Sequence, residues 1–173
     1  AFERSLITPN SRFDQYMRGD KSALSISEKE GLDEFKKAGC AKCHNGAMFS
    51  DFKMHVLGVQ ENDKLSKIDS GFNNTFAFRT PTLRNLQFTF PYMHNGTFNS
   101  LKEILEFYED LSNGKSRNSL VPKDSLDILV IDMDVGAKNM SKIISFLNAL
   151  NDEDFDKSIP ERVPSGLPVG GNI

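Results

Sequence analysis

The sequence contains no tryptophan and only two cysteines, and no apolar run approaches the roughly 20 residues that cross a bilayer. The cysteines, Cys40 and Cys43, are too few and too close together for the disulfide framework of a small secreted domain. Positive charge is not in excess, because 21 Lys and Arg stand against 24 Asp and Glu, and no basic block stands out. The sequence therefore predicts no membrane span and no nucleic-acid partner.

The residues that are present suffice for one ordinary domain. The 173 residues are 38% hydrophobic and 26% charged, and the 14 Phe are compatible with an aromatic-rich interior. Residues 1–20 are interpreted as the end of a preceding helix and a turn-rich interdomain connector, and residues 153–173 as a polar, proline-containing tail. Because the sequence starts as if in mid-helix, without Met or a signal segment, we expect it to be the later part of a longer chain.

Three helices are predicted between these ends. Ser25 and Glu28 form a Ser-x-x-Glu capping box at the start of the first helix, which Gly39 closes. Ser100 and Glu103 repeat this pattern before the second helix. The last helix is indicated by an apolar stripe of Met140, Ile143, Ile144, Leu147 and Leu150. No strand is evident, and the predicted fold class is mostly α with long structured loops.

The two cysteines belong to the motif Cys40-Ala41-Lys42-Cys43-His44, which matches the C-x-x-C-H attachment motif of c-type haem. Two thiols at this spacing can add to the two vinyl groups on one edge of the haem, and the next residue then brings its imidazole to the iron. A redox C-x-x-C or half of a zinc site is less favoured, because no βαβ unit is evident and only two other histidines exist. We predict that residues 21–152 form a cytochrome c-like domain with one covalent haem c and His44 as an iron ligand.

The sixth iron ligand is not fixed by spacing. A small electron-carrier cytochrome c would use methionine, and Met93 or Met54 could serve by spacing alone. Methionines are more often core side chains, however, and Tyr108 on its apolar helical face could equally be a core aromatic. The candidates are Met48, Met54, His55, Met93, His94, Tyr108, Met133 and Met140.

Several segments, in the order in which they occur, resemble one known family. These are residues 1–6 and 11–16, the haem motif continued by Asn45-Gly46, and residues 78–85 and 90–96. They resemble the C-terminal haem domain of the bacterial di-haem cytochrome c peroxidase family, which includes the MauG-type enzymes. The resemblance covers nearly all of residues 1–151.

The resemblance implies an oxidoreductase in which two cytochrome c-like domains face each other. This chain would hold the electron-transfer haem, and the peroxidatic haem would lie in an N-terminal domain, so no catalytic residue is expected here. A periplasmic bacterial protein is implied, with a small redox protein as electron donor and hydrogen peroxide or an oxidisable protein as substrate. The alternative is a free-standing mono-haem electron carrier without catalysis of its own.

The resemblance also implies a sixth ligand, since the family's ligand follows the position of His94 by fourteen residues, at Tyr108. Peroxidases of the family have Met there, whereas MauG-type proteins have Tyr. A phenolate is a hard anionic donor that favours ferric iron, while a thioether favours ferrous iron. Tyr108 therefore favours MauG-like chemistry.

The family resemblance suggests three further roles. A calcium ion between the domains would be bound partly by the backbone carbonyls of Thr89 and Pro91. Arg79 and Arg84 would pair with haem propionates because guanidinium matches carboxylate, although both could be ordinary surface or interface arginines. His94 is expected near the domain interface as a hydrogen-bonded structural residue rather than a ligand.

Overall fold

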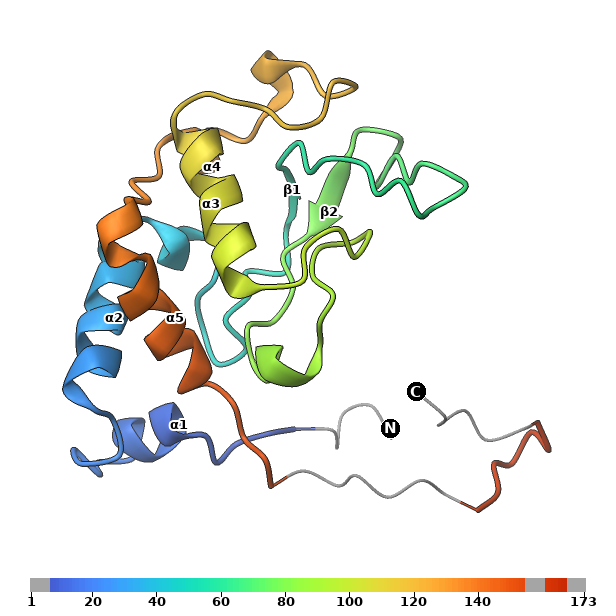
Figure 1. The fold of residues 1–173 in the computed structure, drawn as a ribbon. Helices are drawn as coiled ribbons and strands as arrows, with labels where there is room; N and C mark the ends of the chain where they lie inside the picture. Colours follow the sequence, from blue (N-terminus) through green and yellow to red (C-terminus); the bar gives the residue numbers. More distant parts are fainter. Residues whose placement is uncertain (1–6, 155–160, 168–173) are drawn as a thin grey trace.

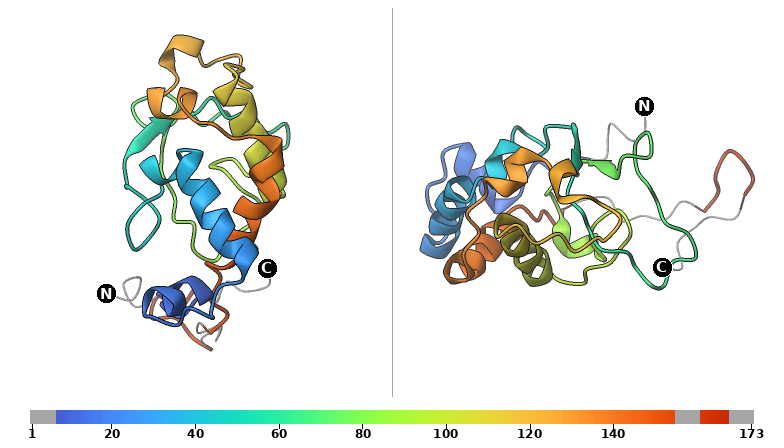
Figure 2. Two further views of the ribbon diagram at one scale, coloured as in Figure 1. Left: turned by 90° about the vertical axis from the view of Figure 1, so that its left-hand side faces the viewer. Right: turned by 90° about the horizontal axis from the view of Figure 1, so that it is seen from above.

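The computed structural model describes residues 7–154 and 161–167. Helices α2 (Ile26–Lys37), α3 (Leu101–Ser112) and α5 (Met140–Asn148) lie on one side of the molecule, and a short β-pair with long loops lies on the other (Figures 1 and 2). This arrangement confirms the predicted mostly α fold with structured loops. No helix within the described ranges is both long and apolar enough to cross a bilayer.

Helix α2 begins as its sequence predicts. The hydroxyl of Ser25 accepts a hydrogen bond from the Glu28 N–H, and the Glu28 carboxylate accepts one from the Ser25 N–H. This reciprocal capping box satisfies two backbone donors that the helix itself leaves free. Helix α2 then packs along α5, and Gly31 lies so close to α5 that a Cβ there would overlap the Lys142 carbonyl oxygen.

Helix α3 is also capped by the predicted serine, but its box is not closed in the predicted way. Ser100 accepts from the Glu103 N–H at 3.2 Å, while the Glu103 carboxylate accepts from the N–H of Asn99 instead of Ser100. The inner face of α3 carries Leu105, Phe107 and Leu111, which are 4% exposed or less. This buried face fixes the helix against the interior.

The structure contains a short β-pair that is not evident in the sequence. Strands β1 (Met54–Val56) and β2 (Ala77–Arg79) pair antiparallel, with His55 opposite Phe78. Each strand has only three residues, too few for a period of two to stand out in the sequence. Between α3 and α5, a single helical turn, α4 (Ile128–Ile131), was also not predicted.

The segment before α2 contains a helix where only turns were expected. Helix α1 (Arg12–Met17) has a capping box of Ser11 and Asp14, and its Phe13 ring packs against Phe49 and Phe146. Backbone bonding ties it further to the domain, since the Phe13 N–H donates to the carbonyl of Ala149 at 3.1 Å. The predicted helix end over residues 1–6 and most of the tail lie outside the described residues.

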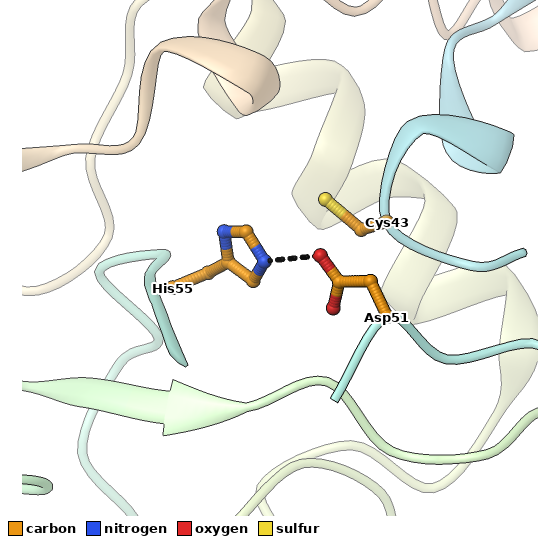
Figure 3. A group of neighbouring side chains, drawn as sticks. All are labelled: Cys43, Asp51 and His55. Carbon is orange, nitrogen blue, oxygen red and sulfur yellow. Dashed lines mark hydrogen bonds and ion pairs between the residues drawn. The ribbon is translucent and has the colours of Figure 1, made fainter. Parts of the chain in front are cut away.

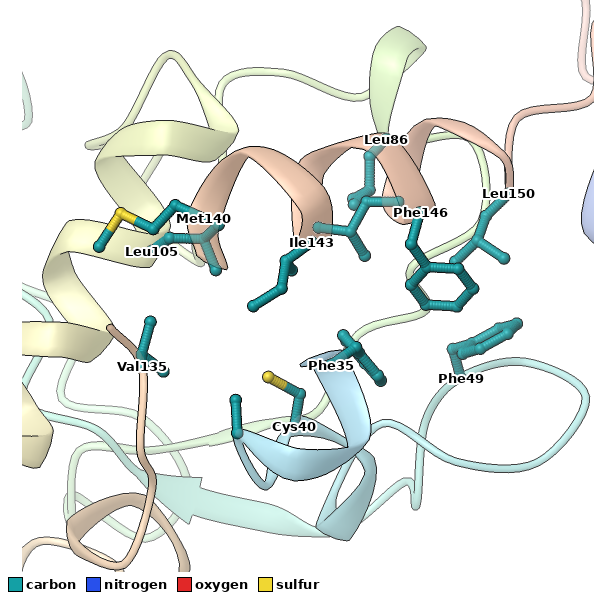
Figure 4. Packing of buried hydrophobic residues seen from close by; sticks show 12 residues of the cluster. Phe35, Cys40, Phe49, Leu86, Leu105, Val135, Met140, Ile143, Phe146 and Leu150 are labelled. Atoms are coloured by element: carbon teal, nitrogen blue, oxygen red, sulfur yellow. The ribbon is translucent and has the colours of Figure 1, made fainter. Parts of the chain in front are cut away.

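Two apolar clusters form the core. One joins α2, α5 and the haem motif, and Figure 4 shows Cys40 pointing into it with Ile143 and Phe35. The other is built around α3 and α4 and includes Phe98, Phe107 and Val130. Three side chains pack against both clusters: Tyr92, Tyr108 and Met133.

The α2–α5 contact predicts an unusual effect of adding one methyl group. A Cβ at Gly31 would collide with the carbonyl oxygen of Lys142 and lie 2.9 Å from the Cβ of Phe146. Gly31→Ala should therefore lower the free energy of unfolding by about 1–3 kcal/mol, measured by chemical denaturation, although alanine is the better helix former. Gly136→Ala is the matched control, because nothing lies within 4 Å of a Cβ there. A stabilised Gly31→Ala protein would contradict this packing.

Candidate haem site

The C-x-x-C-H motif follows directly on α2. Gly39 takes a left-handed conformation at φ +91°, which ends the helix and starts a 3-10 turn over Cys40–Lys42. Within this turn the His44 N–H donates to the Cys40 carbonyl at 2.9 Å. Both cysteines are free, and burial raises the pKa of Cys40 to about 12 and that of Cys43 to about 11. They are therefore uncharged thiols at neutral pH.

The ring of His44 is oriented by one hydrogen bond. Its Nδ1 lies 2.9 Å from the carbonyl oxygen of Phe49, which can only accept, so Nδ1 carries the proton. Burial lowers the pKa of His44, which favours this neutral form. The unprotonated Nε2 is then available as a metal ligand, in the arrangement that second-shell hydrogen bonds impose on ligating histidines.

Cys40, Cys43 and His44 open into one cavity of about 500 Å³. Such a volume suits a cofactor-sized ligand. The apolar part of the wall comes from all three long helices, from α4 and the residues after it, from strand β2, and from the segments that follow β1 and β2. These residues are Phe35, Leu57, Val59, Phe78, Leu83, Leu86, Met93, Leu101, Ile104, Leu105, Leu129, Val130, Met133, Ile143 and Leu147. A cavity lined in this way suits a large apolar macrocycle.

Tyr108 brings a polar group into this apolar cavity from α3. Its hydroxyl has no hydrogen-bond partner among the described residues, whereas the hydroxyl of Tyr92 donates to the Leu86 carbonyl at 2.9 Å. Burial first, and then the nearness of Cys40 and Cys43, raise the pKa of Tyr108. A tyrosine hydroxyl in apolar surroundings normally has a partner, so the Tyr108 oxygen is suited to a ligand in the cavity.

The other sixth-ligand candidates separate into three groups. Met48, Met54 and Met140 are not among the cavity-lining residues, and Met54 is 45% exposed. Met93 and Met133 do line the cavity and stay open as alternatives. The histidines lie at its wall but are engaged otherwise, since His55 contacts a carboxylate at each ring nitrogen. His94 stacks on Phe78 with ring centroids 3.5 Å apart.

The chain is similar to known proteins in sequence and in fold. The chain is 30% identical over 171 residues to the cytochrome c551 peroxidase of Nitrosomonas europaea, covering 95% of this chain and 46% of that protein. It is 32% identical over 165 residues to the methylamine utilization protein MauG of Methylorubrum extorquens, covering 92% and 44%. A solved MauG-like protein associated with microbial copper homeostasis matches with a TM-score of 0.69 at 25% identity, over 88% of this chain and 51% of that one.

This chain belongs to the bacterial di-haem cytochrome c peroxidase and MauG family. No family profile matches its sequence. The chain spans about half the length of the curated relatives it matches. The family implies haem c as cofactor, and the paired thiols, the oriented imidazole, the apolar cavity and the unpartnered Tyr108 hydroxyl all fit that group.

The two arginines that are predicted to pair with haem propionates differ in the contacts that their guanidinium groups make. Arg79 lines the cavity with its guanidinium 4.7 Å above the Phe52 ring, so its role stays a prediction. Arg84 also lines the cavity, and its guanidinium makes four hydrogen bonds, to the carbonyls of Ala47 and Thr8 and to both carboxylate oxygens of Asp14, so its propionate role likewise stays a prediction. Arg84 thus ties the segment before α2 to the loop after His44.

The structure also reveals a group that the sequence did not indicate. His55 lies between the carboxylates of Asp51 and Asp127, and the Asp51 N–H donates to the Cys43 carbonyl at 2.8 Å. Asp127 is 72 residues from His55 in the chain, so no local spacing could signal the pairing. The sequence alone offers His55 as a candidate iron ligand and gives no sign of this pairing.

The clamp between Arg84 and Asp14 predicts coupled stability. Both side chains are largely buried, at 11% and 14% exposed. Asp14→Asn and Arg84→Gln should each lower the free energy of unfolding by about 1.5–3 kcal/mol, and the double variant by much less than the sum. Urea denaturation of the four proteins measures this coupling. Additive losses would mean that the two residues do not act together, and Lys37→Gln, which breaks an exposed pair, should change little.

The same clamp should weaken in acid. Burial alone would raise the pKa of Asp14, but hydrogen bonds from Arg84 and Ser11 outweigh it and lower that pKa below its ordinary value of 3.8. The pair therefore contributes its full stability above that value and loses it as the pH falls through the lowered pKa. The stability difference between the wild-type and Asp14→Asn proteins should shrink correspondingly at low pH.

Proposed function

We propose that this chain is the electron-transfer haem domain of a di-haem oxidoreductase, with one haem c attached through Cys40 and Cys43. His44 and Tyr108 are the proposed iron ligands. The observation that carries this proposal is that His44, with its Nε2 free, and Tyr108, with its hydroxyl unpartnered, open into the same apolar cavity as both thiols. Haem, when bound, supplies one-electron redox chemistry at its iron.

The residues around the cavity suit electron transfer better than catalysis. With His44 and Tyr108 as its two protein ligands, the iron would have no open coordination position for peroxide. Peroxide cleavage also needs a positioned acid–base group. Among the described cavity-lining residues, His55 is engaged at both ring nitrogens and His94 stacks on Phe78, so neither supplies such a group from where it stands.

The proposed catalytic centre is therefore a second haem in an N-terminal domain, in the half of the relatives that this chain does not span. A small redox protein would deliver electrons to this domain, which would pass them to the second haem. Hydrogen peroxide or an oxidisable protein residue is the proposed substrate. The proposed location is the bacterial periplasm, because haem c is attached outside the cytoplasm.

A calcium ion is proposed between the two domains. Thr89 and Pro91 both lie at the wall of the cavity, and both are exposed. Their carbonyls would supply only two oxygens of a shell that normally has about six to eight. The remaining ligands would come from water or from the partner domain, so this chain should hold calcium weakly.

Replacing Tyr108 should change the iron's ligation. Tyr108→Phe removes the ligand oxygen and should change the ferric absorption spectrum, by opening the site or recruiting water. Tyr108→Met should raise the reduction potential, because a thioether stabilises the ferrous state that a phenolate disfavours. Spectra and potentiometric titration of the haem-loaded proteins measure both effects.

Met93→Leu and Met133→Leu are the controls, since both methionines line the cavity and compete for the same role. Their spectra should match that of the unmodified protein. An unchanged spectrum in both Tyr108 variants, together with a changed one in either methionine variant, would assign the ligand to that methionine.

The isolated chain should be redox-active but a poor peroxidase. Steady-state peroxide reduction with an artificial donor should be far below that of the cytochrome c551 peroxidase of Nitrosomonas europaea, assayed in parallel. The same assay is applied to Tyr108→Ala. Peroxide turnover that appears only in this variant would show that the Tyr108 ligand blocks a latent catalytic site. Turnover by the unmodified chain close to that of the full-length relative would make this haem the catalytic one and overturn the proposal.

A further inference from the structure

Three ionisable side chains form a cluster, and the central one, His55, lines the cavity. His55, on strand β1, places Nδ1 2.6 Å from Oδ2 of Asp127 and Nε2 3.1 Å from Oδ2 of Asp51. The side chains of His55 and Asp51 are 9% exposed, and that of Asp127 is 22% exposed. Figure 3 shows His55 facing Asp51, with the sulfur of Cys43 beside them.

The contacts fix the charge of this cluster. An ionised carboxylate can only accept hydrogen bonds, so both ring nitrogens of His55 must donate and the ring is an imidazolium. The outer carboxylate oxygens are also bonded, because Asp127 accepts from the Leu129 N–H and Asp51 from the Lys53 N–H. Burial would raise the pKa of Asp51, but hydrogen bonds from the Lys53 backbone, Thr80 and His55, together with the charge of His55, hold it at about 2. One cation between two anions leaves a net charge of −1.

The cluster stands at the attachment point of the haem. Cys43, Asp51 and His55 each have a ligand-type atom within 4.8 Å of the others. The same three residue types could suggest a metal site. Here, however, the Cys43 sulfur is required for the thioether, and both nitrogens of His55 already contact carboxylates. The Asp51–His55–Asp127 cluster therefore acts as a fixed charge beside the edge of the haem, not as a metal site.

We propose that the Asp51–His55–Asp127 cluster sets the reduction potential of the haem, with His55 as the positioning residue that holds both carboxylates in place. This inference rests on the proposed haem attachment at Cys43. A buried net negative charge stabilises the ferric over the ferrous state, in the same direction as a tyrosinate ligand. His55 limits the effect by cancelling one of the two carboxylate charges.

The test compares variants that change the charge in opposite directions. His55→Gln removes the cation and leaves two anions, so the potential should fall. Asp127→Asn and Asp51→Asn each remove an anion, so the potential should rise at a pH below the ordinary histidine pKa of about 6.5, where His55 keeps its proton. Asparagine keeps an acceptor for the backbone N–H of Leu129 or Lys53, which preserves the α4 cap in the first case. Each shift should be on the order of tenfold in the reduction equilibrium constant, about 59 mV for one electron.

The double variant His55→Gln/Asp127→Asn restores a net charge of −1 and should return the potential close to that of the unmodified protein. Lys102→Gln is the matched control, since it removes an exposed positive charge and should shift the potential little. Spectroelectrochemical titration at fixed pH and ionic strength gives all the values, and thermal unfolding shows that each variant is folded.

Opposite signs in the single variants, with recovery in the double variant, are the expected result. Shifts of the same sign in all of them would mean a merely structural role, such as admission of water to the cavity, and would overturn the proposal. If His55→Gln does not fold, the two asparagine variants still decide, because a fall or no change in either one overturns it. An unmodified protein without covalent haem would instead contradict the proposed function itself.

Discussion

The hydrogen bond from Nδ1 of His44 to the Phe49 carbonyl is the contact on which the site depends. It fixes the tautomer and aims Nε2 into the cavity, and it requires the loop after the motif to fold back on itself. That loop is closed by Asp51 and Ser50, whose N–H groups donate to the Cys43 and Asn45 carbonyls. Two polar anchors, Arg84 on Ala47 and His55 on Asp51, then hold this loop against the rest of the domain.

These anchors differ in what they connect. Arg84 joins the loop after His44 to α1, because it bonds both the Ala47 carbonyl and the Asp14 carboxylate. The position of the segment before α2 is therefore linked to the haem motif. His55 joins the same loop to strand β1 and, through Asp127, to the start of α4, which contributes Leu129 and Val130 to the cavity. The apolar wall supplies the space for the haem, while these polar contacts fix where the ligand imidazole stands.

Much of this architecture could be predicted because its signals are local. The Ser25–Glu28 box, the helical stripe from Met140 to Leu150 and the C-x-x-C-H motif each lie within a few residues. The β-pair could not be predicted, since its strands have three residues each and owe their pairing to tertiary position. The Arg84–Asp14 and His55–Asp127 contacts could not be predicted either, because they join residues 70 and 72 positions apart and no local spacing indicates them.

The central claim is that this chain carries one haem c on Cys40 and Cys43. Intact mass spectrometry of the protein produced with a haem c maturation system, followed by mapping of the peptide that contains residues 40–44, tests it most directly. The account predicts one haem per chain, retained after acid–acetone extraction and found on that peptide. A colour that extracts, or a mass that fits the apoprotein, a disulfide or a zinc-bound form, would contradict it.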